Sequence, residues 1–138
     1  MKVFFDSSAL AKRYIEDKMK SDQIDRLVFD ADSVVVSIIC FPEIISAFVR
    51  LRREKKLNTA QYNQCKRSAV EDFSAFQVCQ LSPEVINRSI TLLEHVELRA
   101  MDALHVACAI ESEASLFVSS DQRQLVAAKK FSLTVNPV

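Results

Sequence analysis

The sequence predicts an α/β protein, a three-layer α/β/α sandwich around a mainly parallel sheet of four to five strands. Two observations support this fold class. Short apolar runs rich in β-forming residues alternate with longer segments of helical periodicity, which is typical of a parallel sheet covered by helices on both faces. The length of 138 residues and the hydrophobic fraction of 49% suit one core, so we expect a single domain over residues 1–138.

The N-terminal segment predicts a strand followed at once by a helix. Residues 3–5, Val-Phe-Phe, form an apolar run typical of a buried strand. The following Ala-Leu-Ala-Lys-Arg-Tyr begins a helix that we expect to fade near residues 19–21, and residues 22–29 suggest a short second helix. Asp6 therefore lies at the carboxyl end of a strand, where open α/β sheets bind their ligands.

The middle of the chain predicts a second strand and two long helices. Residues 34–39 are rich in β-branched side chains, as in strands buried on both faces. Pro42 suits the first position of a helix, and apolar residues recur at helical spacing from Glu43 onward. We expect Thr59 to cap the next helix. The expected apolar face of that helix consists of Tyr62, Cys65, Ala69, Val70, Phe73 and Phe76.

The C-terminal half continues the alternation of strands and helices. Ser82 and Pro83 start a helix in the expected way, with the serine as cap and the proline in the first turn. The other elements expected here are an outer strand over 76–81, a helical segment over 98–110, a strand over 116–118, a helix over 122–130 and a last strand over 133–135. This alternation favours parallel pairing of the strands.

Composition excludes several classes of function. Glycine is absent, so the chain has neither a P-loop nor a dinucleotide-binding loop, which need glycine to bring the backbone close to phosphate. The longest nearly apolar run, residues 34–41, falls far short of the roughly 18 residues that indicate a membrane span. The four cysteines are widely spaced and form no Cys-x-x-Cys pair. This favours reduced thiols over zinc ligands or a disulfide framework. We expect a cytoplasmic protein without a membrane segment.

Four acidic residues occupy positions suited to a shared site. Asp6 and Asp121 each follow a predicted strand, Glu43 lies just beyond another, and Asp102 lies at or near the start of a helix. Carboxylates forced together repel each other unless a cation neutralises them, and Mg²⁺ or Mn²⁺ takes oxygen ligands. Such a centre supports metal-dependent hydrolysis of phosphodiester bonds. The hypothesis assigns metal binding and catalysis to Asp6, Glu43, Asp102 and Asp121.

Each of these acids also has a purely structural interpretation, because Asp and Glu are common caps and first-turn residues of helices. Glu84, which follows Pro83 as Glu43 follows Pro42, is assigned to that role alone. His105, one turn after Asp102, is expected to be a hydrogen-bonded core residue. Serines at positions 7, 8 and 119 suit either capping or the orientation of the acids.

Four motifs resemble one family. The stretch Asp6-Ser-Ser-Ala-Leu-Ala-Lys-Arg-Tyr is similar to the opening of PIN-domain ribonucleases, in particular the VapC-like toxins of toxin-antitoxin pairs. The glutamate follows a serine by six residues, as is usual in the family, and Arg-Ala-Met-Asp102-Ala-Leu-His-Val-Ala and Ser-Ser-Asp121 resemble its third and fourth motifs. The chain departs from the pattern at Glu97, where relatives commonly carry a small residue or glycine.

The resemblance implies a PIN-like fold and a Mg²⁺- or Mn²⁺-dependent endoribonuclease acting on RNA. It also implies a toxin neutralised by a cognate antitoxin protein and paired as a homodimer. The basic residues between Arg50 and Lys56 then have two interpretations, a solvated helix end or a rim that holds RNA phosphates. Two other functions stay open, a PIN-like scaffold that binds protein or RNA without cutting it and a haloacid-dehalogenase-like phosphatase. The phosphatase needs an aspartate where this chain has Ser8.

Overall fold

The computed structural model describes residues 1–15 and 18–138. In chain order its elements are β1 (Lys2–Phe5), α1 (Ser7–Leu10), α2 (Lys12–Ile15), α3 (Lys18–Asp30), β2 (Ser33–Ser37), α4 (Cys40–Arg53), α5 (Thr59–Ala75), β3 (Gln77–Cys79), α6 (Pro83–His95), α7 (Ala100–Glu111), β4 (Leu116–Ser119), α8 (Gln122–Lys130) and β5 (Val135–Pro137). None of these helices combines the length and the apolar composition that crossing a membrane requires.

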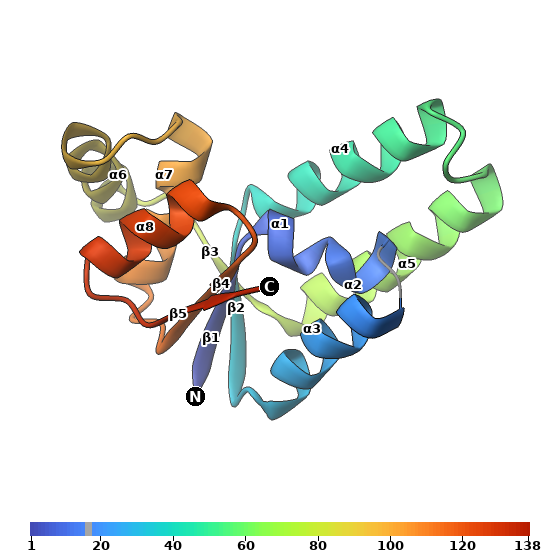
Figure 1. The fold of residues 1–138 in the computed structure, drawn as a ribbon, viewed down its shortest axis with the longest axis horizontal. Helices are drawn as coiled ribbons and strands as arrows, with labels where there is room; N and C mark the ends of the chain where they lie inside the picture. Colours follow the sequence, from blue (N-terminus) through green and yellow to red (C-terminus); the bar gives the residue numbers. More distant parts are fainter. Residues whose placement is uncertain (16–17) are drawn as a thin grey trace.

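The strands form one five-stranded sheet in the order β3-β2-β1-β4-β5, and every neighbouring pair is parallel. Val3 of β1 stands opposite Val34 of β2 on one side and Leu116 of β4 on the other. The chain builds outward from β1 in one direction and then crosses to the other, so the strand order reverses at β1 (Figure 1). In open α/β sheets such a reversal places the ligand crevice at the carboxyl ends of the central strands.

Helices cover both faces of the sheet, which confirms the predicted three-layer sandwich. Val3 and Phe5 of β1 join a core cluster with residues of α1, α3, α4 and α5. Phe4, which points to the opposite face, joins a second cluster with residues of α6, α7 and α8. Phe4 and Phe117 are fully buried and their rings stack with centroids 5.6 Å apart. Burying one such side chain stabilises the fold by about 1.5–3 kcal/mol.

Several predicted boundaries differ from the structure. The first predicted helix is two short helices, α1 and α2, and α3 has already begun at Lys18, before the point where that helix was expected to fade. The second strand ends at Ser37, and α4 begins at Cys40 rather than at Pro42. A proline at the third helical residue is tolerated because the first N–H groups of a helix have no partner within the helix. The last strand lies two residues later than expected, at Val135–Pro137.

The cap of α5 also differs from the prediction. Asn58, not Thr59, is the capping residue: its side chain accepts from the Gln61 backbone N–H, and the Gln61 side chain accepts from the Asn58 backbone N–H, each over 2.8 Å. Of the predicted apolar face of α5, Val70 is exposed. The predicted cap of α6 is confirmed, since Ser82 accepts from the Val85 backbone N–H. All four cysteines are free.

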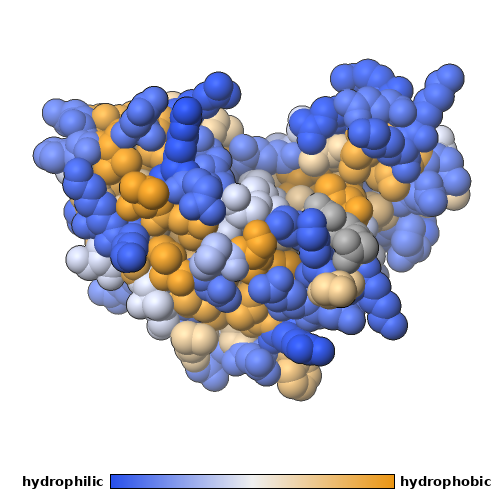
Figure 2. Space-filling model, in the orientation of Figure 1, coloured by the Kyte–Doolittle hydropathy of each residue, from blue (hydrophilic) through white to orange (hydrophobic). Residues whose placement is uncertain are grey.

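Helices α4 and α5 form an antiparallel pair that extends away from the sheet (Figure 1). The Arg52 guanidinium lies 4.2 Å from the centroid of the Tyr62 ring and joins the two helices. Figure 2 shows the surface hollowed between this arm and the side formed by α6, α7 and α8, with hydrophilic side chains along both upper rims. The carboxyl ends of β1 and β4 lead toward this hollow.

Candidate active site

Asp6 lies directly after β1 and is almost fully buried, with 1% of its surface exposed. It caps α1 by accepting from the Ala9 backbone N–H over 2.9 Å. Ser8 lies 2.8 Å from both carboxylate oxygens, and Ser119 at the end of β4 donates over 2.9 Å. Ser8 has one proton for two oxygens, so one lone pair of Asp6 stays free. Burial raises the pKa of Asp6, and the His105 ring and these hydrogen bonds counteract that rise only in part.

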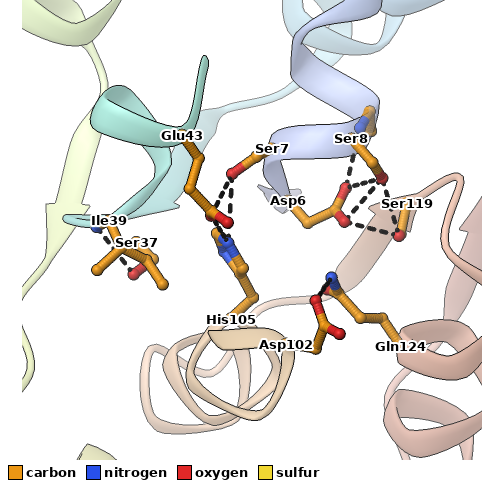
Figure 3. A network of polar contacts seen from close by, with 11 residues as sticks. Asp6, Ser7, Ser8, Ser37, Ile39, Glu43, Asp102, His105, Ser119 and Gln124 are labelled. Atoms are coloured by element: carbon orange, nitrogen blue, oxygen red, sulfur yellow. Dashed lines mark hydrogen bonds and ion pairs between the residues drawn. The ribbon is translucent and has the colours of Figure 1, made fainter. Parts of the chain in front are cut away.

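Glu43 lies in the first turn of α4 and is held through one oxygen (Figure 3). Its Oε1 accepts from Ser7 Oγ over 2.8 Å and from Nε2 of His105. Burial alone raises the pKa of Glu43, but the His105 hydrogen bond and charge, together with the Ser7 hydrogen bond, outweigh it and hold the pKa below its ordinary value. Glu43 is therefore an oriented, ionised carboxylate, and its Oε2 has no hydrogen bond within the described chain.

Asp102 lies in the first turn of α7, and its Oδ1 accepts from Gln124 Nε2 over 3.0 Å. The N-terminus of a helix favours the charged form of an acid. At Asp102, however, burial and the negative charges of Asp121 and Glu43 raise the pKa, although the Gln124 hydrogen bond and His105 act in the opposite direction. The effect of Asp121 and Glu43 on the pKa of Asp102 indicates that both lie in its neighbourhood.

Asp121 follows β4 and caps α8, accepting through Oδ1 from the backbone N–H groups of Arg123 and Gln124 over 2.9 and 3.2 Å. The structural role that Asp and Glu commonly have is thus real for Asp6 and Asp121, which both cap helices. Capping occupies only part of each carboxylate. Oδ2 of Asp121, like Oδ2 of Asp102, accepts no hydrogen bond from the residues that the structure describes.

Two depressions in the surface flank the acids. One, of about 440 Å³, is lined by Glu43, Arg50 and uncharged residues of α1, α2 and α4, including Ser7. The other, of about 360 Å³, is lined by Asp102 and Asp121 together with three residues around them, Arg99, Gln122 and Arg123. The predicted acids therefore stand at one end of the sheet with arginines on either side.

The donor set suits a hard divalent cation. All four predicted acids offer carboxylate oxygens, and within residues 1–15 and 18–138 none of them forms an ion pair with Lys or Arg. Among the described residues His105 is the one basic partner of these acids, and of the four it contacts Glu43 alone. Oxygen ligands and uncompensated negative charge are what Mg²⁺ and Mn²⁺ require. In their present rotamers, however, no three Asp, Glu, His or Cys side chains of the described chain converge as a closed metal site.

Two residues of this network were not assigned to the site from sequence. Gln124, buried on α8, donates to Asp102, and nothing but its place three residues after Asp121 hints at this contact. His105 is a buried, hydrogen-bonded core residue, as predicted, but its partner is Glu43. Ser37, the serine six residues before Glu43, accepts from the Ile39 backbone N–H over 3.3 Å and so shapes the turn that leads into α4 (Figure 3).

A family model described as PIN domain matches residues 3–130, and the chain belongs to this family. The family is one of nucleases, which agrees with a site built from carboxylates. A comparison with curated proteins found no match.

The fold is that of the VapC-like toxins. The structure of FitAB bound to the IR36 DNA fragment is similar with a TM-score of 0.72 and 16% identity, over 98% of this chain and 94% of that one. VapBC2 from Rickettsia felis bound to promoter DNA is similar with a TM-score of 0.66 and 14% identity, over 100% and 99%. VapC20 from Mycobacterium tuberculosis, a toxin that cleaves the sarcin-ricin loop, is similar with a TM-score of 0.64 and 15% identity, over 91% and 94%.

Proposed function

We propose that this PIN-domain protein is a Mg²⁺- or Mn²⁺-dependent endoribonuclease whose nuclease domain spans residues 1–138. Its metal and catalytic residues are Asp6, Glu43, Asp102 and Asp121. Two observations support the proposal: Asp121 and Glu43 lie near enough to Asp102 to raise its pKa, and Asp6 and Asp121 follow neighbouring parallel strands at the edge where α/β sheets bind ligands. Membership of the PIN family supports the same chemistry.

The residues of the chain prepare the site for hydrolysis of a phosphodiester bond. A bound divalent cation supplies positive charge that offsets the carboxylates and polarises both a phosphate and a water molecule. Asp6 is fixed by its cap bond and two serines, and Glu43 is fixed by Ser7 and His105. Asp6 and Glu43 would therefore lose little conformational freedom on binding a cation, because their carboxylates are already oriented.

Arginines on both sides of the acids suit a polyanionic substrate. Arg50 lines the depression beside Glu43, and Arg99 and Arg123 line the one beside Asp102 and Asp121. Their side chains are exposed, so they can contact backbone phosphates. An RNA strand laid across the hollow in Figure 2 would be held on either side of the bond that is cut.

The biological role that we propose is that of a toxin in the cytoplasm, neutralised by a cognate antitoxin protein and paired as a homodimer. Several similar structures are toxin-antitoxin complexes, including VapBC-1 from nontypeable Haemophilus influenzae and a complex from Klebsiella pneumoniae. A short reading frame overlapping the start of this one would encode the candidate antitoxin. Co-expression of that frame should relieve growth arrest caused by this chain.

The direct test is cleavage of RNA by the purified protein with Mn²⁺ and with EDTA. We expect cutting by the wild type with Mn²⁺, none with EDTA, and a loss of about 100-fold or more in Asp6→Asn and Asp102→Asn, because one strong electrostatic contact to the reacting group contributes about that much. Equal cutting by the wild type and both variants would overturn the proposal. RNA binding without any cutting would favour the non-catalytic scaffold instead.

The same samples test the phosphatase alternative. Ser8, which stands where such an enzyme needs its second aspartate, donates a hydrogen bond to Asp6 instead. We therefore expect no release of phosphate from a small phosphomonoester under conditions in which RNA is cut. Release of phosphate without RNA cleavage would favour the phosphatase.

A further inference from the structure

His105 and Ser7 hold the same oxygen of Glu43. His105 lies on α7 and is 1% exposed, whereas Ser7 begins α1 and Glu43 lies on α4. Both Ser7 Oγ and His105 Nε2 contact Glu43 Oε1, and Ser7 Oγ lies 3.2 Å from Nε2 (Figure 3). Three elements that are far apart in sequence thus meet at one carboxylate oxygen.

The contact with Glu43 requires a proton on Nε2 of His105. A carboxylate only accepts, so Nε2 must donate to Glu43. In the described chain, the other nitrogen, Nδ1, is buried and has no partner. The ring also packs edge-on against Phe4, with centroids 6.5 Å apart. These contacts hold the ring in an orientation that directs Nε2 toward α4.

Packing alone does not explain a histidine at this position. Its neighbours on α7, from Val106 to Ala109, are apolar and fully buried. An apolar side chain would fill the same space without leaving Nδ1 buried and unpaired, which is unfavourable. The feature that distinguishes His105 from an apolar residue is its donor to Glu43.

We propose that His105 is a positioning residue of the active site: with Ser7 it fixes Oε1 of Glu43, so that Oε2 is the oxygen offered to the cation. This inference rests on the proposed metal-dependent function. Partners that orient a metal-binding carboxylate or histidine typically contribute about 10–100-fold to metal affinity. The contribution of His105 is therefore measurable in the absence of RNA.

The test compares His105→Leu with His105→Gln. Glutamine keeps an N–H donor within reach of the position of Nε2, whereas leucine keeps only the bulk. Mn²⁺ affinity is measured by the electron paramagnetic resonance signal of free Mn²⁺, with folding checked by circular dichroism. We expect His105→Leu to weaken Mn²⁺ binding by about 10–100-fold and His105→Gln to retain most of the affinity. His95→Leu, at an exposed histidine, is the control and should bind Mn²⁺ as the wild type does.

A double-mutant cycle shows whether His105 acts through Glu43. In the Glu43→Gln background, His105→Leu should cause no further loss, because the carboxylate that it positions is gone. The inference would be overturned if His105→Leu weakened Mn²⁺ binding as much in the Glu43→Gln background as in the wild type. Equal losses of Mn²⁺ affinity in His105→Gln and His105→Leu would overturn it as well. If His105→Leu does not fold, Ser7→Ala supplies the second arm of the same cycle and should weaken binding only while Glu43 is present.

Failure of this inference is distinct from failure of the proposed function. If the wild type binds Mn²⁺ and Asp6→Asn does not, the metal site stands, and normal binding by His105→Leu removes only the positioning role. If the wild type and Asp6→Asn bind Mn²⁺ equally weakly, the metal site and the positioning role fall together.

Discussion

Asp6 has an observed structural role and, in our proposal, a metal-binding role as well. It caps α1 through its bond to the Ala9 N–H, and it is also the most deeply buried of the predicted site acids. A buried carboxylate without a Lys or Arg partner is costly to keep ionised, which is why burial raises its pKa. The metal-free protein is therefore expected to be less stable because of this carboxylate, at a position where the proposed function needs a charge.

Asp6→Asn should accordingly stabilise the protein in the absence of metal. Asparagine caps helices as well as aspartate does and removes the buried charge. We expect the melting temperature in EDTA at neutral pH to rise by a few degrees, measured by circular dichroism. Mn²⁺ should raise the melting temperature of the wild type but not that of the variant, because only the wild type binds the ion. A variant that melts lower than the wild type in EDTA would contradict this.

The stability difference between the wild type and Asp6→Asn should depend on pH, because the pKa of Asp6 is raised in the folded protein. The folded-state pKa lies above the ordinary value of 3.8, so the folded protein binds the extra proton more tightly than the unfolded chain does. The wild type should therefore lose stability relative to Asp6→Asn as pH rises from about 4 through the folded-state pKa, and the difference should then level off. Denaturant unfolding in EDTA at several pH values measures it.

Glu43 and Glu84 form a matched pair within the chain. Each follows a proline in the first turn of a helix, α4 or α6. Only Glu43 lies at the site, bonded to His105 and Ser7. We expect Glu43→Gln to reduce RNA cleavage by about 100-fold or more and Glu84→Gln to leave it unchanged, since the helix dipole term that both variants lose is worth only about 0.3–1 kcal/mol. Similar losses in both variants would show that the effect comes from the helix.

At the scale of elements, the absence of glycine is visible at three helix ends. Helices α4, α7 and α8 each end with the same pair of backbone hydrogen bonds, for example Ala114 N–H to Ala109 C=O and Glu113 N–H to Ile110 C=O after α7. This arrangement needs a left-handed residue, usually glycine. Within the described residues the left-handed positions are Lys55, Glu113 and Ser132, with φ of 60°, 56° and 69°. Glu97, where relatives commonly carry a small residue or glycine, is not among them.

Replacement of Glu113 by glycine should stabilise the protein. A side chain with Cβ costs roughly 1–2 kcal/mol in the left-handed region, and the added freedom of glycine in the unfolded chain offsets about 0.4–1 kcal/mol of the gain. We expect Glu113→Gly to raise the free energy of unfolding by about 0.5–1 kcal/mol in urea unfolding. Ser112→Gly, at the neighbouring residue with φ of −84°, is the control and should not stabilise.

At the scale of the whole molecule, the order of the strands places the acids of the proposed site. Because β1 lies at the centre, Asp6 after β1 and Asp121 after β4 emerge at the same end of neighbouring strands. The two core clusters lie on opposite faces of the sheet, and the helices of both layers carry predicted site acids. Glu43 lies on α4 in one layer, and Asp102 on α7 and Asp121 at the start of α8 belong to the other. The hollow between the layers is where a substrate would contact arginines of both.

Arg50 should contribute to RNA binding through its charge. Arg50→Gln in the Asp6→Asn background, which prevents cutting, is expected to weaken RNA binding and to reduce the slope of log K against log salt by about 0.7, the value for one contact to a single strand. Fluorescence anisotropy at several salt concentrations measures this. Lys66→Gln, at an exposed base on α5 that lines neither depression beside the acids, is the control and should change neither quantity. An equal effect of both variants would indicate non-specific attraction.

Much of the fold follows from local patterns. The bounds of α8, the cap of α6 and the outer position of β3 agree with prediction because periodicity and capping depend on residues a few positions apart. The predicted cap of α5 was wrong because two neighbouring residues can cap: Asn58 rather than Thr59 does so, since Gln61 completes a reciprocal pair with it. The predicted last strand was wrong for a non-local reason, because its position at residues 135–137 depends on pairing with β4.

The sequence by itself determined that strands and helices alternate around a parallel sheet and that four acids stand at the starts of helices or the ends of strands, because these features follow from spacing along the chain. Tertiary structure alone decided which side chains these acids contact. Glu43 and His105 are 62 positions apart, and Asp102 and Gln124 are 22 apart. Contacts over such separations have no local signature, since they depend on the order in which strands assemble and on how helices from both layers pack at one end of the sheet.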